Sequence, residues 1–371
     1  MLSKIKQKGV VWFLKRLALE FRSPYYPASK KIVSFIRKFN LFSRHVTTVI
    51  PISQDDTLYI FYDLNVESHT FDFAYFLVDA EIFAKKKNIK KLFLWIIPKV
   101  IQSQADDDDY TKAVGHHSFS WRINNMLLPI SGLHSLYSGY GVLPKGASIN
   151  SYVKEGLVYP ENFTDSYRPR LAEFTERRDI YRSNLFQGFS APPQGKKYIS
   201  EWVNSLNTDL RIISITLRQY GFDSSRNSNI QEWLKFADWL KEKNYQPVFV
   251  PDTESCWDLD GKLAQHIIFK EPCWNLGLRM AFYEECALNY FYSNGCAAIA
   301  VLNKNVASIV MMPVIKESKN ATETMNTMHD PAYDSRRLAF AQQNQWWSKD
   351  IDTFENLKND FLAYEKLYLL K

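Results

Sequence analysis

The sequence predicts an α/β protein of two domains, each built on a parallel sheet. The chain has 371 residues, 46% of them hydrophobic and 23% charged, which is typical of a folded protein too long for one core. A buried strand, a helix and a second buried strand follow one another from about residue 57, and this pattern restarts near residue 209. Units of this kind form parallel sheets with right-handed crossovers.

The first of these units lies between residues 57 and 98. Continuous apolar runs predict strands over Thr57–Asp63 (TLYIFYD) and Lys91–Pro98 (KLFLWIIP). Apolar residues at helical spacing predict a helix over Thr70–Lys87. The acidic run Asp106–Asp109 is expected to be a loop, and residues 119–145 to add a further strand or helix.

The second unit begins with a predicted strand at Asp209–Thr216 (DLRIISIT). Helices are predicted over Asn229–Lys243, Gly277–Tyr290 and Ile351–Leu369, and strands over Gln246–Pro251, Cys296–Leu302 and Ala307–Met312. Aromatic residues make up 15% of the chain. Most are expected to fill the cores, and the alternative is a ligand site lined by rings that stack on sugars or bases.

These patterns divide the chain into four parts: a basic helical segment (1–45), a first domain (46–190), a second domain (191–345) and a C-terminal helix (346–371). Residues 155–200 are rich in Pro, Arg and Tyr and are interpreted as the connection between the domains.

The positive charge is concentrated in residues 1–45. This segment holds eleven Lys or Arg and one acid, Glu20, so it carries +10; because the whole chain carries +6, the remainder carries −4. Amphipathic helices are predicted over residues 3–22 and Ala28–Asn40. Basic faces beside apolar faces suit an anionic membrane surface, and the alternative is two helices packed on the body of the protein. No nucleic-acid-binding module is recognisable, so nucleic acid is not an expected partner.

Cysteine usage and hydropathy indicate a cytoplasmic protein. The four cysteines form no CxxC pair, so free thiols in a reducing compartment are expected: Cys256, Cys273, Cys286 and Cys296. Nothing resembles a secretory signal, and no apolar run is long enough to span a bilayer. We expect peripheral attachment to the inner membrane face if residues 1–45 bind lipid.

The stretch Thr216–Asn229 (TLRQYGFDSSRNSN) is the leading candidate for a ligand site. It lies between a predicted strand and a predicted helix, and open α/β sheets bind ligands outside the carboxyl ends of their strands. A helix N-terminus favours anions, and the guanidinium groups of Arg218 and Arg226 suit phosphate. Asn227 or Ser228 is expected to cap the helix. The alternative is a capped helix whose surface arginines pair with neighbouring acids.

A second candidate is Asn275–Gly295 (NLGLRMAFYEECALNYFYSNG). Arg279 and Tyr283 would share a helix face, and the turn Ser293–Gly295 is expected to precede a strand and to let backbone N–H groups approach a phosphate or sugar. An ordinary helix ended by a turn is the alternative. The predicted phosphate ligands are therefore Arg218, Arg226, Asn227, Arg279, Asn294 and Gly295.

Carboxylates and a histidine supply the remaining candidates. The predicted acceptors of hydrogen bonds from ribose or sugar hydroxyls are Asp252, Glu254 and Glu284. For Asp252 and Glu254 the alternative is an ordinary acid in a loop. A carboxylate or a neutral imidazole can remove a proton from a sugar hydroxyl. The predicted general bases are Asp63, Asp72 and His116.

Three stretches carry a family resemblance: FYDLNVESHTFDFAYFLVDAE with KLFLWIIP, ISITLRQYGFDSSRNSNIQEW with VFVPDTE, and NLGLRMAFYEECALNYFYSNG. They resemble bacterial glycosyltransferase-like proteins associated with surface-polysaccharide biosynthesis. The resemblance implies the GT-B fold, in which two Rossmann-like domains face a cleft and a C-terminal helix returns to the first domain. It also implies transfer of a sugar from a nucleotide-activated donor to a glycan or lipid-linked acceptor, with no cofactor.

The sequence departs from the family pattern in one respect, since the second domain has no pair of glutamates eight positions apart as in retaining enzymes. Asp258-Leu259-Asp260 matches the DxD metal motif of another glycosyltransferase class, but its surroundings do not, so no metal is predicted. Two other functions stay open. One is a non-catalytic scaffold of the same shape that docks on a membrane or a partner enzyme, and the other is a nucleotide-sugar epimerase or hydrolase.

Overall fold

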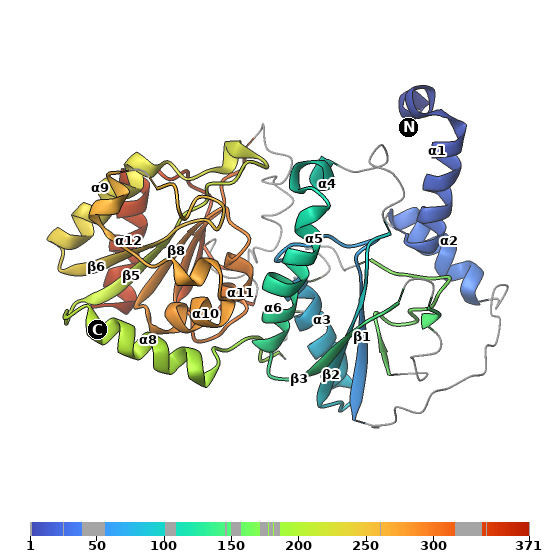
Figure 1. Cartoon of the computed structure of the whole chain (residues 1–371), viewed down its shortest axis with the longest axis horizontal. Helices are drawn as coiled ribbons and strands as arrows, with labels where there is room; N and C mark the ends of the chain where they lie inside the picture. Colours follow the sequence, from blue (N-terminus) through green and yellow to red (C-terminus); the bar gives the residue numbers. More distant parts are fainter. Residues whose placement is uncertain are drawn as a thin grey trace. The chain divides into compact units, whose positions relative to one another are not determined.

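In a computed structural model, the chain divides into two compact units (Figure 1). The structure describes residues 2–24, 26–38, 56–100, 109–144, 147–149, 157–170, 177, 181, 186–259, 261–315, 336–338 and 340–370. The first unit comprises Met1–Ser68, Ala80–Ile101 and Leu136–Ala172, and the second comprises His69–Asp79, Gln102–Ser135 and Glu173–Lys371. This division differs from the predicted boundary at residue 190, because two segments of the N-terminal half belong to the second unit.

The first unit contains a parallel four-stranded sheet in the order β3-β2-β1-β4. Its strands are β1 (Thr57–Asp63), β2 (Lys91–Ile97), β3 (Tyr137–Val142) and β4 (Val158–Tyr159). Every residue of β1 is buried, as expected for a central strand covered on both faces. The two predicted strands are confirmed, and residues interpreted as a connection between domains supply β4.

Two basic N-terminal helices and the helix between the first two strands are the helices described next to this sheet in the chain. Helices α1 (Leu2–Arg22) and α2 (Pro27–Lys38) occupy the two ranges in which amphipathic helices are predicted, and the predicted end at Asn40 lies outside the described residues. Gly9 has a φ of 80° and interrupts the regular geometry of α1. Helix α3 (Phe73–Lys86) connects β1 to β2 as predicted. None of the helices in the described part of the chain is long and apolar enough to cross a membrane.

A buried polar network holds the first half of α3 in the second unit. Asp79 on α3 accepts hydrogen bonds from Arg177 Nε (3.0 Å) and from the Tyr181 hydroxyl (2.6 Å). All three side chains are almost fully buried, so the charges of Asp79 and Arg177 compensate each other away from water.

The second unit contains a parallel six-stranded sheet in the order β10-β9-β8-β5-β6-β7. Its strands are β5 (Arg211–Thr216), β6 (Tyr245–Val250), β7 (Ile267–Ile268), β8 (Leu288–Tyr292), β9 (Ser308–Met311) and β10 (Gln345–Ser348). Numbered along the chain from β5, this is the order 3-2-1-4-5-6 of a doubly wound Rossmann sheet read from β7 to β10. The winding reverses between β5 and β8, so the topological switch point lies between these strands.

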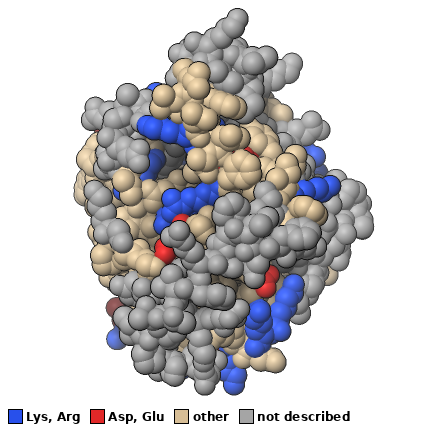
Figure 2. Space-filling model, turned by 90° about the vertical axis from the view of Figure 1, so that its right-hand side faces the viewer, with Lys and Arg blue, Asp and Glu red and all other residues tan. Residues whose placement is uncertain are grey.

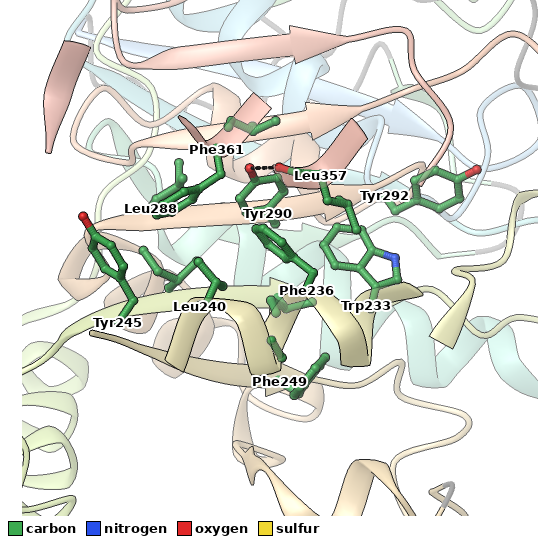
Figure 3. Close-up of a cluster of buried hydrophobic side chains, with 14 of the residues drawn as sticks. Trp233, Phe236, Leu240, Tyr245, Phe249, Leu288, Tyr290, Tyr292, Leu357 and Phe361 are labelled. Carbon is green, nitrogen blue, oxygen red and sulfur yellow. Dashed lines mark hydrogen bonds between the residues drawn. The ribbon is translucent and has the colours of Figure 1, made fainter. Parts of the chain in front are cut away.

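Five α-helices among the described residues between 193 and 368 belong to this unit, and some of them pack their apolar side chains against the sheet. They are α8 (Pro193–Ser205), α9 (Ile230–Glu242), α10 (Leu276–Glu285), α11 (Ala297–Val301) and α12 (Phe354–Tyr368). Side chains of α9 and α12 meet those of the central strands in one apolar cluster, where the Tyr290 hydroxyl donates to the Leu357 carbonyl (3.1 Å) (Figure 3). Helix α12 therefore packs into the second unit, which corrects the expectation that residues 346–371 return to the first domain.

Two elements of the second unit differ from the prediction. The helix expected over Gly277–Tyr290 ends at Glu285, and the apolar residues that follow form the fully buried strand β8. The strand expected over Cys296–Leu302 is the short helix α11. Periodicity alone does not distinguish a short buried strand from a short buried helix. The turn Ser293–Gly295 consequently follows a strand and precedes a helix, which is the reverse of the expected order.

A helical segment between residues 109 and 132 also belongs to the second unit. It contains α4 (Asp109–Val114), α5 (His117–Arg122), the π-helix η2 (Ile123–Leu127) and α6 (Leu128–Gly132). The side-chain amides of Asn124 and Asn125 donate to the carbonyls four residues before them, which an α-helix would use for backbone bonds. This competition accounts for the π-helical turn. Asp109 begins α4, and Asp106 to Asp108 lie outside the described residues.

Candidate functional site

The predicted phosphate-binding residues lie at the switch point of the six-stranded sheet. Strands β5 and β8 are direct neighbours, with Thr216 paired to Phe291 near their carboxyl ends. Ligands of doubly wound sheets bind outside such a point. Two loops leave the sheet here: residues 217–229 after β5, and residues 293–296 after β8.

The loop after β5 is closed by its own hydrogen bonds. Arg218 and Ser228 are joined twice, because each backbone N–H donates to the other residue, at 2.9 Å in both cases. The Tyr220 N–H donates to the Asn227 side-chain oxygen (3.0 Å). Asn227 and Ser228 thus shape the loop, and neither caps the following helix as predicted.

The N-terminus of α9 is occupied by a carboxylate from elsewhere in the second unit. Asp352 Oδ2 accepts hydrogen bonds from the Asn229 N–H (2.7 Å) and from the indole N–H of Trp233 (2.8 Å). Asp352 therefore already compensates the positive end of this helix dipole. The carboxylate offsets part of the positive charge that α9 was expected to offer a phosphate, so the arginines are the stronger source of positive charge at this site.

Arg226 connects the two loops. Its Nε donates to Ser293 Oγ (2.8 Å) and its Nη2 donates to the Ser293 carbonyl (2.7 Å), while Asp223 lies 4.0 Å away. Burial, reinforced by the charge of Arg218, lowers the pKa of Arg226 to about 10. Arg226 is therefore still charged at neutral pH, but its charge is incompletely compensated by its surroundings.

Asn294 and Gly295 complete the second loop. The amide of Asn294 donates to the Thr216 carbonyl at the end of β5 (3.1 Å), so it bridges the switch point. A Cβ on Gly295 would lie 3.0 Å from a ring carbon of Phe71. The absence of a side chain at Gly295 thus lets the segment before α3 approach the loop closely.

Arg218 is buried near the start of the loop after β5. Its Nη2 donates to the carbonyls of Phe222 (2.7 Å) and Asp223 (3.3 Å), and its Nε has no hydrogen-bond partner. No carboxylate of the described residues lies within ion-pair distance of it. Burial lowers its pKa, which indicates that the protein itself does not fully compensate this charge.

Arg279 on α10 is a second buried guanidinium without an ion pair among the residues that the structure describes. It donates to the Pro272 carbonyl (2.7 Å), the Tyr283 hydroxyl (3.1 Å) and the Cys296 sulfur (3.2 Å). Arg279 and Tyr283 do share one face of the helix, as predicted. Neutral partners orient the guanidinium, and Asp252 is a nearby acid that interacts electrostatically with it.

Asp252 and Glu254 follow β6 and lie beside the arginines. Arg279 and Arg218 both interact electrostatically with Asp252, and the Gln219 N–H donates to it (3.3 Å). Burial nevertheless raises the pKa of Asp252, and burial together with the charge of Asp252 raises the pKa of Glu254. The structure therefore brings Arg218, Arg226, Arg279, Asn294, Asp252 and Glu254 together, and we call these six residues the arginine cluster.

Arg122 and Tyr220 border the arginine cluster and were missed in the sequence. Arg122 Nη2 donates to the Tyr220 hydroxyl (2.9 Å), and its Nη1 donates to the His69 carbonyl (3.2 Å). Arg122 lies directly before the π-helical turn, a feature that often accompanies functional sites. The consecutive residues Asn124 and Asn125 are the feature of the sequence that coincides with this turn.

The predicted general bases have different surroundings. Asp72, in the second unit, is exposed; it accepts a hydrogen bond from Thr70 and interacts electrostatically with Arg226. His116 is half-buried with its ring edge-on to Phe119 (5.4 Å between centroids). Asp63 belongs to the first unit, where it is buried and forms an ion pair with Arg168 (2.7 Å).

Glu284 is not part of the arginine cluster. Its carboxylate accepts hydrogen bonds from the Ala191 N–H (2.7 Å) and the Asn303 amide (2.7 Å), and it pairs with Lys196 (2.7 Å). Glu284 lies five residues beyond Arg279 on α10, toward the opposite end of that helix. The expected contact with a sugar is therefore replaced by a bond between α10 and the start of α8.

Within the described part of the chain, no group of three or more His, Cys, Asp or Glu side chains could hold a metal ion. Asp260 of the DxD match lies outside that part. All four cysteines are buried and free.

Comparisons with known proteins gave weak structural similarity and no sequence match. No family model and no curated protein matches the chain. It is similar to a family 9 glycosyl transferase from Veillonella parvula, with 11% identity, a TM-score of 0.48, and coverage of 84% of this chain and 92% of that one. It is also similar to the E. coli ADP-heptose heptosyltransferase II, with 12% identity, a TM-score of 0.39, and coverage of 84% and 99%.

Proposed function

We propose that this chain is a glycosyltransferase that transfers a sugar from a nucleotide-activated donor to a glycan or lipid-linked acceptor. The observation that supports this proposal best is the arginine cluster at the switch point of a Rossmann sheet. Buried guanidiniums whose charge is incompletely compensated require an anion. A diphosphate between a sugar and a nucleoside has the charge and the length to contact several of them.

The arginines would act on the leaving group. In the transfer, the bond between the sugar anomeric carbon and the diphosphate oxygen breaks, and a bond from the acceptor oxygen to that carbon forms. Negative charge then develops on the departing nucleoside diphosphate, and fixed guanidiniums stabilise it without reorganisation. Arg226, held at Ser293, and Arg279, held at Pro272 and Tyr283, have the required fixed orientation.

Asp252 and Glu254 would bind hydroxyls of the donor. An acid after the second strand of a Rossmann sheet is placed to accept hydrogen bonds from a ribose. Asp252 occupies this position after β6, beside Arg218 and Arg279. The acids and the arginines can therefore contact the ribose and the diphosphate of one ligand.

Asp72 is the general base that we favour among the three candidates. Its carboxylate is exposed and close enough to Arg226 for electrostatic interaction, so a proton acceptor lies near the proposed leaving group. His116 remains an alternative in the same unit. Asp63 is engaged by Arg168 and by two bonds from Asn65, which would have to rearrange before it could accept a proton.

Residues 1–45 would attach the enzyme to an anionic membrane surface on the cytoplasmic side. On α1, Val10, Leu14, Leu17 and Phe21 form one apolar stripe at helical spacing, and each is 40–64% exposed. Exposed Lys15 lies next to this stripe. Figure 2 looks onto the right-hand side of Figure 1 and shows Lys and Arg side chains in several groups, with acids beside some of them. The combination of apolar and basic side chains suits an anionic interface.

Vesicle binding tests this attachment. The full chain should sediment with vesicles containing phosphatidylglycerol and not with pure phosphatidylcholine, and Leu14→Gln with Phe21→Gln should abolish sedimentation. Equal sedimentation of this double variant would contradict the proposed attachment.

A ligand screen followed by product analysis tests the enzymatic function. Nucleoside diphosphates should raise the melting temperature of the protein, because a ligand that binds only the folded state stabilises it. Incubation with nucleotide sugars and an acceptor should then release nucleoside diphosphate together with a glycosylated product. Release without that product would favour a hydrolase, an isomerised donor would favour an epimerase, and no binding at all would favour a non-catalytic scaffold.

A further inference from the structure

Three exposed tryptophans of the second unit occur near the arginine cluster. The chain has ten tryptophans, all described, and only Trp121, Trp257 and Trp274 are exposed, by 36%, 76% and 46%. Trp121 and Trp274 form an edge-to-face pair with ring centroids 5.9 Å apart. Such a pair covers one face of one ring, so other ring faces stay open to a ligand. Exposed tryptophans beside a charged site often mark binding surfaces.

Trp274 lies beside the acids of the cluster. The preceding residue, Cys273, donates through its thiol to the Pro251 carbonyl (3.2 Å) and accepts from the Thr253 hydroxyl (3.0 Å). Cys273 is thus bonded to both chain neighbours of Asp252. Trp274 also lies five residues before Arg279, two residues before the helix that carries this arginine.

Trp121 lies on the same side of the cluster. It precedes Arg122, which donates to the Tyr220 hydroxyl and interacts electrostatically with Glu254. The π-helical turn after Arg122 is where the helix departs from regular α geometry. Two segments far apart in sequence therefore supply this tryptophan pair, and the chain neighbours of both tryptophans interact with the loop of Asp252 and Glu254.

We propose that Trp121 and Trp274 form a stacking surface for the base of a nucleotide donor. This inference rests on the proposed function and specifies its ligand: a nucleoside diphosphate, as opposed to a sugar phosphate or a lipid phosphate. The kinds of groups in this part of the second unit support it. Tryptophans, acids and arginines occur together there, and they suit the base, the ribose and the diphosphate of such a ligand respectively. Stacking on a tryptophan accepts any base, because every base has an aromatic face.

Trp257 provides a matched control. It is the most exposed of the three, and its ring lies 4.9 Å from the Lys270 ammonium. It stands three residues after Glu254 in the same loop, but it is not part of the Trp121–Trp274 pair. Replacing Trp257 removes the same kind of side chain without touching the Trp121–Trp274 pair.

The test is titration calorimetry with nucleoside diphosphates and with inorganic pyrophosphate, on the wild type and on Trp274→Ala, Trp274→Phe, Trp121→Ala and Trp257→Ala. Trp274→Ala should weaken nucleoside diphosphate binding by about tenfold, the value of one lost base-stacking contact, and leave pyrophosphate binding unchanged. Trp121→Ala should act in the same direction, whereas Trp274→Phe and Trp257→Ala should bind almost as the wild type does.

Several results would overturn this inference. Unchanged binding in Trp274→Ala, or equal losses for both ligands, would show that the pair does not recognise the base. A raised KM for the acceptor with unchanged nucleoside diphosphate binding would assign the surface to the acceptor sugar. A wild type that binds pyrophosphate but no nucleoside diphosphate would contradict the proposed function itself, so the two failures are distinguishable.

Discussion

Arg226 holds Ser293 through two hydrogen bonds that connect the loop after β5 with the turn after β8, at 2.8 Å to the hydroxyl and 2.7 Å to the carbonyl. Ser293 has a φ of 48°, a left-handed conformation that is uncommon for serine, and its N–H donates to the Met311 carbonyl (2.8 Å). The contact fixes both sides of the switch point and orients one guanidinium of the arginine cluster.

The forked geometry of Arg226 should matter as much as its charge. Arg226→Lys keeps the charge but cannot make both bonds to Ser293. We expect Arg226→Lys and Arg226→Ala to weaken nucleoside diphosphate binding by about tenfold, the equivalent of one charged hydrogen bond. Ser293→Ala, which removes one of the two bonds, should have a smaller effect in the same calorimetric titration. Wild-type affinity in Arg226→Lys would show that this orientation is unimportant.

Asp352 should contribute to the stability of the second unit. Asp352→Ala removes the acceptor for the Asn229 N–H and leaves the buried Trp233 N–H without this partner. Urea unfolding should show a loss of about 1–3 kcal/mol, as for a lost cap and an unsatisfied buried donor. Exposed Asp350 is the control, and Asp350→Ala should change stability by less than about 0.5 kcal/mol. Similar losses in both variants would contradict the capping role.

The close contact with Phe71 should require a glycine at position 295. Gly295→Ala adds a methyl group that would lie 3.0 Å from the Phe71 ring, so we expect a loss of about 1–3 kcal/mol from overpacking. Combining it with Phe71→Ala removes the clash, and a double-mutant cycle measured by urea unfolding should show that the two losses are less than additive. Strict additivity would show that the two residues do not touch.

Asp252 should make stability depend on pH in a defined direction. Burial raises its pKa in the folded protein, so the folded state binds a proton more readily than the unfolded state. Relative to Asp252→Asn, the wild type should therefore gain stability as pH falls through the raised pKa and lose it as pH rises. Urea unfolding of both proteins between pH 4 and pH 7 measures this difference. An opposite slope would show that the arginines outweigh burial.

Local patterns predicted much of the fold. The buried strands β1, β2, β5, β6 and β9 and the helices α1, α3, α9 and α12 were expected close to their observed bounds, because long apolar runs and strong helical spacing leave little ambiguity. Strand β8 and helix α11 were interchanged in type, since each is a five-residue apolar segment.

Tertiary contacts limited how much of the candidate site could be predicted from the sequence. Arg218 and Arg226 could be named because arginines between a strand end and a helix indicate anion binding. Arg279 could be named because it shares a predicted helix face with Tyr283 ahead of a small polar turn. The role of Asp352 could not be predicted, since it lies 123 residues beyond Asn229, whose N–H donates a hydrogen bond to it. Glu284 was misplaced because sequence proximity to Arg279 does not show that the two side chains face different partners.

The binding of a nucleoside diphosphate to Arg218→Ala tests the central claim most directly. Arg211, at the opposite end of β5, where it donates to the Leu369 carbonyl, is the matched control. In titration calorimetry we expect Arg218→Ala to bind at least about tenfold more weakly than the wild type, the value of one lost charged contact, and Arg211→Ala to bind equally well. Wild-type affinity in a folded Arg218→Ala protein would contradict the claim that these arginines hold the leaving group.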